Sequence, residues 1–360
     1  MPRAKARSSE EAFRTTVKMI CPGTTIREAI SSILQGGTGA LLCFGAPKRL
    51  ADLSEGGVQL DQPTTPQLLY ELCKMDGAIL LNREGTRILY ANRFLKPDAS
   101  IESKETGTRH RAAERLARQA KCAVIAVSER RASVTLFVHD YKHVMDGIPT
   151  LLNKASQALQ ALEKYITVLN QAMLDLSIRE FQDMVTIFDV CRAVQRTEMV
   201  VRISKELEPY ILELGEDGRL VELQLNELIQ PVKEANLIVK DYFNDNGKQA
   251  SINQVPEKLA ELSREELLNL GNISQILGFS QNLRRVDTYL APRGFRALSQ
   301  THRLTPQIID NLVDSFDSLQ QIMRAQKEEL VEVEGIGEVL AERIRVGLNL
   351  LQNQLALDRR

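Results

Sequence analysis

The sequence contains no tryptophan, few other aromatic residues and no long apolar run. Aromatic residues make up only 5% of its 360 positions, which argues against a β-sandwich or an aromatic-lined sugar site. No apolar run is long enough to cross a bilayer. The charged segment 1–11 also lacks the hydrophobic core of a signal peptide. We therefore expect a cytoplasmic protein with no membrane partner.

Cysteine is scarce, and the net charge of the chain is close to zero. The five cysteines are far apart, so they do not form the close pairs of a zinc site, and they lie in apolar runs. This pattern predicts buried, reduced thiols at Cys21, Cys43, Cys73, Cys122 and Cys191. The formal net charge is −1. Any contact with nucleic acid must therefore come from a local patch and not from a general basic field.

The first part of the chain, 1–146, has the pattern of an α/β domain. Short, near-continuous apolar runs alternate there with helical patterns, which suits a central mixed sheet flanked by helices on both faces. Strands are expected at Gly39–Phe44, Gly77–Leu81, Arg87–Ala91, Cys122–Ser128 and Ser133–Val138. Helices are expected at Ile26–Gln35, Pro66–Met75 and His110–Ala120.

The second part, 147–287, is predicted to be an all-α spine of long helices. From Thr150 to about Phe243 glycine is almost absent, and apolar residues recur every three or four positions. One helical stripe comprises Leu151, Leu152, Ala155, Leu159, Leu162, Ile166 and Leu169. Similar patterns run through Ile178–Leu214 and Arg219–Phe243. The polar segment Asn244–Pro256 is predicted to be a loop.

The third part, 288–360, contains short helices and one specific motif. A short helix leads into Gly335-Ile336-Gly337, and a second helix with an apolar stripe follows at once. The glycines let the backbone turn sharply and approach a partner, while Ile336 fills the core beneath. The free N–H groups at the start of the second helix would bind a DNA phosphate, with Arg343 and Arg345 adding charge.

This segment resembles the helix-hairpin-helix motif of DNA repair proteins. Such a hairpin contacts the sugar-phosphate backbone of DNA and not the base edges, so it recognises DNA shape independently of sequence. Acidic residues surround it, which should weaken binding to plain duplex, and these are Glu328, Glu329, Glu332, Glu334 and Glu338. A degenerate second copy is expected at Phe295–Leu298 and Pro306–Phe316. The alternative is a helical turn that merely uses Gly-x-Gly.

Two clusters in the α/β domain are candidates for phosphate chemistry. Asp76-Gly77-Ala78 lies where a helix ends and a strand begins, and Thr106–Arg111 lies where a helix begins. Gly, Thr and Arg at a helix start suit phosphate, with Thr108 as a possible cap. Ser128–Arg131 adds a third basic point at a strand end. Taken singly, each is weak: an Asp-Gly turn, a packed His110 and solvated arginines are the ordinary alternatives.

The chain as a whole resembles the DisA family of bacterial DNA integrity scanning proteins. The resemblance covers essentially the full length, and its Asp-Gly-Ala and Arg-His-Arg clusters are the defining ones of the family. The matching segments are Leu72–Ile79, Ile88–Asn92, Glu105–Arg115, Ile125–Arg131, Leu290–Arg296 and Val333–Glu338. Phe295 replaces the tyrosine usual in the family.

The resemblance implies a diadenylate cyclase that condenses two ATP into cyclic di-AMP and two pyrophosphates, with Mg²⁺ or Mn²⁺. It further implies a nucleoid-associated homo-octamer that senses branched or damaged DNA. Asp76, the lone carboxylate of the two clusters, would hold either the metal or the attacking 3′-hydroxyl. Arg109, His110 and Arg111 are the other expected catalytic residues. The expected ATP-binding set is Gly77, Leu95, Thr108, Arg109, His110, Arg111, Ala112, Ser128 and Arg130.

Two other readings of the sequence are weighed against this one. A DNA-binding scaffold with a non-catalytic ATP domain is the alternative, although the intact Asp76 and arginines argue against it. A nuclease subunit is disfavoured because no acidic cluster in the α/β part suits a two-metal nuclease site.

Overall fold

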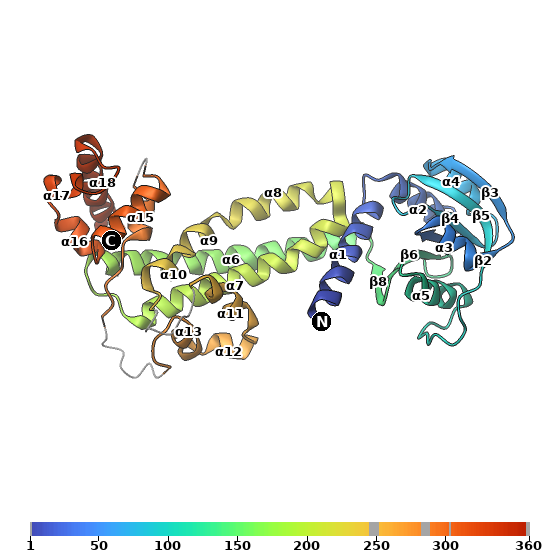
Figure 1. Ribbon diagram of the computed structural model, residues 1–360, viewed down its shortest axis with the longest axis horizontal. Coiled ribbons are helices and arrows are strands. Elements are labelled where there is room, and N and C mark those ends of the chain that lie inside the picture. The colour runs from blue at the N-terminus through green and yellow to red at the C-terminus, as the bar shows by residue number, and fades with distance from the viewer. Residues whose placement is uncertain (1, 245–251, 282–288, 302–303, 358–360) are drawn as a thin grey trace. The chain divides into compact units, whose positions relative to one another are not determined.

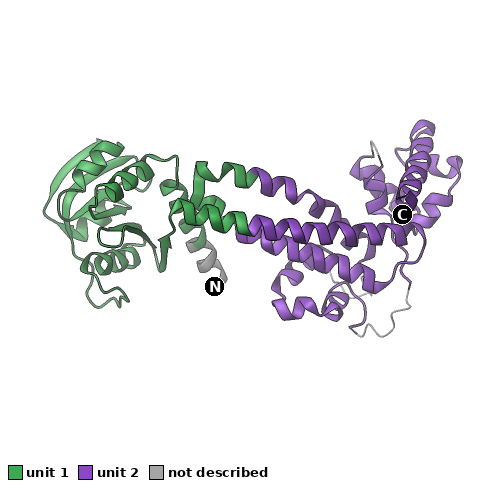
Figure 2. Cartoon of the chain, turned by 180° about the vertical axis from the view of Figure 1, so that it is seen from behind, with its two compact units in different colours: residues 1–157, 207–222 green, residues 158–206, 223–360 purple. Residues whose placement is uncertain are grey.

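The computed structural model describes residues 2–244, 252–281, 289–301 and 304–357, with side chains from residue 10 onward. The described chain divides into two compact units, one of 1–157 with 207–222 and one of 158–206 with 223–360 (Figure 2). The division into domains 1–146, 147–287 and 288–360 stays a prediction.

The first unit is built on one mixed, eight-stranded sheet. The strand order is β2-β5-β4-β1-β6-β7-β8, with β3 paired to β5. β1 and β4 are parallel, whereas the other pairs are antiparallel. The strands are β1 Ala40–Phe44, β2 Ser54–Glu55, β3 Val58–Pro63, β4 Ala78–Leu81, β5 Arg87–Leu95, β6 Ala123–Ser128, β7 Ser133–Val138 and β8 Tyr141–Met145.

Helices cover both faces of this sheet, as predicted (Figure 1). On one face α1 (Pro2–Ile20), α2 (Thr25–Gln35) and α4 (Pro66–Leu72) pack against alternate strand residues. On the other face lie α3 (Pro47–Asp52) and α5 (Thr108–Ala120), whose Leu116 and Ala117 are fully buried. The central strands β1 and β4 are buried at every position because both faces are covered.

Most expected elements of this unit are confirmed within a few residues, but several were missed. The strands β3 and β8 are mostly exposed. They therefore lack the apolar run that marks a covered strand. β5 also extends beyond its expected end at Ala91: Asn92 has a positive φ of 54°, and the strand continues past it to Leu95. The five cysteines are free and buried, as predicted.

The long helices are confirmed in kind but not in their boundaries. α6 covers Ile148–Phe181 and α7 covers Ile187–Leu214, so the expected single helix Ile178–Leu214 is wrong. The chain turns between them at Asp183, where φ is 57°, and the carboxylate of Asp189 accepts the N–H and hydroxyl of Thr186. The expected helix Arg219–Phe243 is also broken. It consists of α8 Arg219–Leu228, α9 Gln230–Ala235 and α10 Leu237–Tyr242, preceded by a 3₁₀ turn, Gly215–Gly218.

The remaining described chain is a series of short helices that ends in one long helix. The expected loop Asn244–Pro256 falls partly outside the described residues, and its end is helical, since a 3₁₀ turn covers Ile252–Gln254 and α11 begins at Val255. No described helix has the length and apolar character needed to cross a membrane. The helices are α11 Val255–Glu261, α12 Arg264–Leu268, α13 Leu270–Ile276, α14 Phe295–Ser299, α15 Pro306–Ser315, α16 Leu319–Arg324, α17 Lys327–Val331 and α18 Glu338–Leu357.

A buried charge network joins α6, α10 and α14 in the second unit. The guanidinium of Arg296 is 1% exposed and donates to the Glu180 carboxylate at 2.8 Å and to the Ser177 hydroxyl at 2.9 Å. The Tyr242 hydroxyl donates to the same Glu180 carboxylate. Asp241 accepts the backbone N–H groups of residues 294–296 at 2.7–3.0 Å and so caps α14. The network therefore fixes three helices to one another.

Removing the cation should destabilise the second unit strongly. Arg296→Met leaves Glu180 buried without its partner, and breaking a buried pair in this way costs about 3–5 kcal/mol. Chemical denaturation followed by far-UV circular dichroism measures the change. Arg324→Met, at an exposed position, is the matched control and should stay within about 0.5 kcal/mol of wild type. Equal stabilities of the two variants would contradict the role of the network.

Candidate functional site

The two predicted phosphate clusters and the basic strand end meet at one edge of the sheet. Because β1 and β4 are parallel, the starts of both strands lie at the same edge, and Gly77 directly precedes β4. β6 runs antiparallel to β1 with Ala40 opposite Val127, so its last residue, Ser128, lies at that edge too. Residues separated by about fifty positions in the sequence are thereby brought together, as the prediction requires.

The start of α5 offers free backbone donors at this edge. Gly107 is the residue that caps the helix, and it has no side chain to accept a hydrogen bond. The expected cap role of Thr108 is wrong, because Thr108 is already the first helical residue. The first N–H to find a helical acceptor is that of Arg111, which donates to the Gly107 carbonyl at 2.9 Å. The N–H groups of residues 108–110 have no intrahelical partner, and the positive end of the helix dipole lies behind them.

The loop before α5 is held by a buried carboxylate that sequence reasoning missed. Glu114 is 6% exposed and accepts the Ser103 hydroxyl and the Lys104 N–H, the latter at 3.2 Å. Arg118, one turn further along α5, donates to the second oxygen of Glu114 at 2.7 Å. A carboxylate at an otherwise apolar position of the helix was the available sequence signal. Glu114 therefore fixes the approach of the chain to the cluster Thr106–Arg111.

Two of the three consecutive basic residues of α5, His110 and Arg111, have different surroundings. The guanidinium of Arg111 donates to the backbone carbonyls of Glu105 and Thr106 at 3.3 and 3.4 Å. Burial lowers the pKa of His110, and the positive charges of Lys142, Arg109 and Arg131 lower it further against the opposing effect of Glu105. Arg131, which contributes to this lowering, belongs to the turn after β6. Arg130, in the same turn, is exposed.

The remaining predicted residues of this site differ in exposure. Asp76 is exposed, and within the described part of the chain no hydrogen bond or ion pair engages it. Gly77 has a φ of 94°, and an added Cβ would lie 2.9 Å from the Arg93 carbonyl oxygen, so the backbone itself requires glycine there. Leu95 is 8% exposed and packs with the core on the α5 face. Ala112 also contacts that core.

The Asp76 carboxylate could bind a divalent cation that is also bound by phosphate oxygens of a substrate. Among the described residues no group of three or more His, Cys, Asp or Glu side chains could hold an ion alone. Mg²⁺ commonly uses one or two carboxylates together with substrate phosphates. Asp76, exposed and unengaged in the described chain, fits that mode.

The second candidate site is the hairpin between α17 and α18. The expected turn is confirmed: Gly335 has a φ of 85°, and Ile336 is 5% exposed within the core of this region. A Cβ added at Gly337 would meet nothing within 4 Å in the described chain, so that side of the turn is open. The upstream pair is α14 and α15, and residues 302–303 between them lie outside the described residues.

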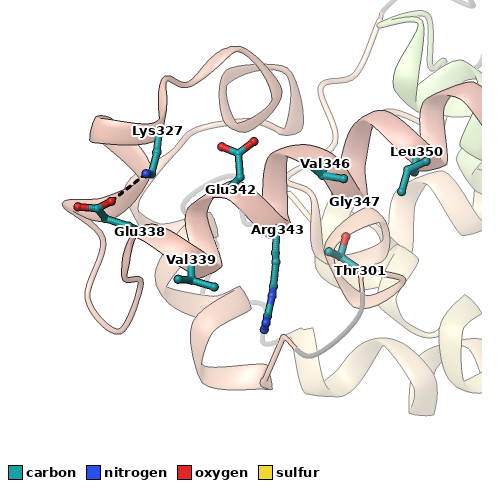
Figure 3. A pocket seen from close by; sticks show the side chains of 9 residues that line it. All are labelled: Thr301, Lys327, Glu338, Val339, Glu342, Arg343, Val346, Gly347 and Leu350. Atoms are coloured by element: carbon teal, nitrogen blue, oxygen red, sulfur yellow. Dashed lines mark hydrogen bonds and ion pairs between the residues drawn. The ribbon is translucent and has the colours of Figure 1, made fainter.

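Charged and apolar residues line a groove of about 660 Å³ along α18 (Figure 3). Lys327 pairs with Glu338, the first residue of α18, at 2.9 Å. Arg343 is exposed and points away from that pair, whereas Arg345 lies 3.7 Å from Glu342 in an exposed ion pair. Val346 and Leu350 continue the groove as exposed apolar side chains. The predicted basic residues Arg343 and Arg345 therefore lie on α18, which also carries the carboxylates of Glu338 and Glu342.

Comparison with known proteins covers almost the whole chain. Three family models match: a DisA bacterial checkpoint controller nucleotide-binding region at 27–141, a DisA bacterial checkpoint controller linker region at 145–286, and a SAM-like helix-hairpin-helix tandem at 295–349. The DNA integrity scanning protein DisA of Clostridium perfringens strain SM101 is 43% identical over 97% of this chain and 98% of its own. The protein of the same name from Clostridium botulinum strain Kyoto is 44% identical over the same shares.

Two histidines of the first unit should titrate in opposite directions from the ordinary value of 6.5. The pKa of His110 is expected below it, because burial and positive neighbours penalise the protonated ring. The pKa of His143 is expected above it, because its Nε2 lies 2.9 Å from the Glu213 carboxylate. NMR titration of the imidazole signals measures both. Glu213→Gln is the control, and it should return His143 towards 6.5 and leave His110 unchanged. The reverse order of the two pKa values would contradict the described environments.

Proposed function

Because the chain belongs to the DisA family of bacterial checkpoint controllers, we propose that its first domain is a diadenylate cyclase. It condenses two ATP molecules into cyclic di-AMP and releases two pyrophosphates. The observation that carries this proposal is the meeting of the uncapped α5 start, the Asp76-Gly77 loop and the Ser128 strand end at one sheet edge. Free N–H donors, arginines and a carboxylate without a partner in the described chain are what phosphoryl transfer between bound nucleotides needs.

In the proposed reaction the 3′-hydroxyl oxygen of each ATP bonds to the α-phosphorus of the other. The bond from that phosphorus to the bridging oxygen breaks, pyrophosphate leaves, and the hydroxyl proton is lost. Thr108–Ala112 form the cradle of the triphosphate, which is held by the free backbone N–H groups of residues 108–110 and by the guanidiniums of Arg109 and Arg111. Ser128 and Arg130 bind the departing pyrophosphate, and Leu95 and Gly77 border the nucleoside.

Asp76 takes one of two roles in this proposal. It is either a ligand of Mg²⁺ or Mn²⁺, or it accepts a hydrogen bond from the attacking 3′-hydroxyl. A divalent cation, when bound, neutralises phosphate charge. Burial and neighbouring positive charges lower the pKa of His110, which favours its neutral form. A neutral imidazole can donate one hydrogen bond to a phosphate oxygen without adding a proton to the site.

The product itself implies paired active sites. One domain offers one phosphate cradle, whereas cyclic di-AMP contains two phosphodiester links, so each ATP must act as nucleophile and electrophile. Two copies of the cyclase domain must therefore face each other. We propose a homo-oligomer, an octamer by the resemblance, in the cytoplasm and associated with the nucleoid.

The hairpin region is proposed to bind branched or damaged DNA without sequence preference and to couple that binding to cyclisation. Gly335 supplies the sharp turn and Gly337 the open approach, so that a phosphate reaches the first N–H groups of α18. Arg343 and Arg345 add positive charge next to the phosphate. Since phosphate contacts dominate such a site, affinity should fall steeply with salt.

The cyclase role is tested at Asp76. Asp76→Asn removes the charge and keeps the shape, so nucleotide binding should persist while product falls by about 100-fold or more. Mass spectrometry of cyclic di-AMP formed from ATP with Mg²⁺ or Mn²⁺ measures the loss. Asp52→Asn, at an exposed position at the end of α3, is the control and should retain activity. Near-normal turnover of the Asp76 variant would remove this residue from the reaction.

The DNA role is tested at Gly337, where substitution meets no atom of the described chain. Gly337→Val should block the close approach of a phosphate and weaken binding to a four-way junction by about tenfold or more. Gel-shift titration at fixed salt measures this change. Gly147→Val, where an added Cβ meets only Pro149 at 3.9 Å, is the control and should bind normally. Cyclic di-AMP synthesis without DNA should be unchanged, and junction binding as tight as wild type would exclude the hairpin.

A further inference from the structure

We propose that Gly39 is a positioning residue for the reaction, because its missing side chain leaves the space that the Arg109 guanidinium occupies. The inference rests on the proposed cyclase function, in which Arg109 holds phosphate. Gly39 directly precedes β1 and lies at the sheet edge where the candidate site is assembled. It belongs to neither of the clusters that the sequence singles out.

Any larger residue at position 39 would collide with the Arg109 side chain. A Cβ placed on Gly39 would lie 1.9 Å from Nη1 of Arg109 and 3.1 Å from its Cζ. Ordinary van der Waals contact begins near 3.4 Å, so the guanidinium would have to leave this position. The guanidinium thus lies directly over the Gly39 backbone.

The backbone of Gly39 does not itself require glycine. Its φ lies outside the left-handed region, unlike those of Gly37 and Gly77 at the same end of the sheet. Of the three described atoms nearest to the added Cβ, one belongs to the backbone, the Val127 carbonyl oxygen at 3.3 Å, and a shift of a few tenths of an ångström would relieve that contact. Alanine would therefore suit the strand, and Arg109 is the main reason for glycine.

The position over Gly39 places the Arg109 guanidinium at the sheet edge where β1 begins. Arg109 originates in the first turn of α5. Its charge reaches Cys73, on the approach to Asp76, where it opposes the burial that raises the pKa of that thiol to about 12. If the Arg109 side chain were displaced from Gly39, its charge would no longer lie at this position. Because Gly39 has no side chain, the Arg109 guanidinium can lie at this position, and this determines where the proposed cradle carries its positive charge.

The test is a double-mutant cycle in the full chain. Gly39→Ala should lower kcat/KM for cyclic di-AMP synthesis by about ten- to hundredfold, the range expected for one charge-assisted phosphate contact. In an Arg109→Ala background the same substitution should cost less than about twofold, because no guanidinium remains to be displaced. Calorimetric titration with a non-hydrolysable ATP analogue should show the same non-additivity in affinity.

Gly45→Ala is the matched control, since it adds the same methyl just beyond the opposite end of β1, near Cys122 and Leu50. It should retain nucleotide affinity and activity. Thermal unfolding of both variants separates loss of fold from loss of function. Wild-type kcat/KM in Gly39→Ala would overturn the inference, as would an equal loss in the Arg109→Ala background.

Failure of the proposed function gives a different result. If the wild-type chain forms no cyclic di-AMP, the cyclase proposal fails whatever Gly39 does. The crystal structure of the Gly39→Ala variant then decides the inference alone, because the Arg109 guanidinium must have moved off the substituted position. A guanidinium that stays in place beside the added methyl group would refute the positioning role.

Discussion

The C-terminal half of the chain depends on one buried cation, the guanidinium of Arg296. A charge removed from water is costly unless it is paired and hydrogen-bonded. Here Glu180 and Ser177 on α6 supply those partners, while Asp241 on α10 accepts the N–H groups that begin α14. Burial raises the pKa of Glu180 to about 7 even though the Arg296 cation opposes that rise and favours the ionised carboxylate. α14 opens the hairpin tandem, and the network therefore fixes the frame from which the tandem extends.

A second feature is how the helix starts are capped: several helices use a side chain, whereas the helices of the two proposed phosphate sites begin after a glycine. In the described chain a side chain caps the first turn of α2, α4, α12, α13, α15 and α16, through Thr24, Thr65, Ser263, Asn269, Thr305 and Ser318. Each thereby satisfies its own first-turn donors. α5 begins instead at Gly107, and Gly337 directly precedes α18. Glycine leaves the donors of these two helices free for an external anion, and an anion is what both proposed activities bind.

The sequence predicts those parts of the molecule whose local pattern matches their environment. β1, β4, β6 and β7 were found because strands covered on both faces are apolar at successive positions. The edge strands β3 and β8 were missed because an exposed edge carries no such run. The hairpin was found because its glycines and Ile336 are adjacent in sequence. Gly39 could not be found in this way, since its importance arises from a guanidinium that reaches it only in the folded chain. Glu114 carried one signal, a carboxylate at an otherwise apolar helix position, but the loop that it holds is brought to it only by folding.

The electrostatics of the hairpin bear on which DNA the protein would recognise. Glu338 stands in the first turn of α18, where its carboxylate is stabilised by the helix dipole and by Lys327. A phosphate approaching Gly337 must compete with that carboxylate, so a single hairpin should bind plain duplex weakly. Linked sites that engage together gain affinity without any new contact, but only when their geometry permits simultaneous binding. In the proposed oligomer, several weak hairpins would therefore select DNA by the arrangement of its arms, which favours junctions over a single duplex.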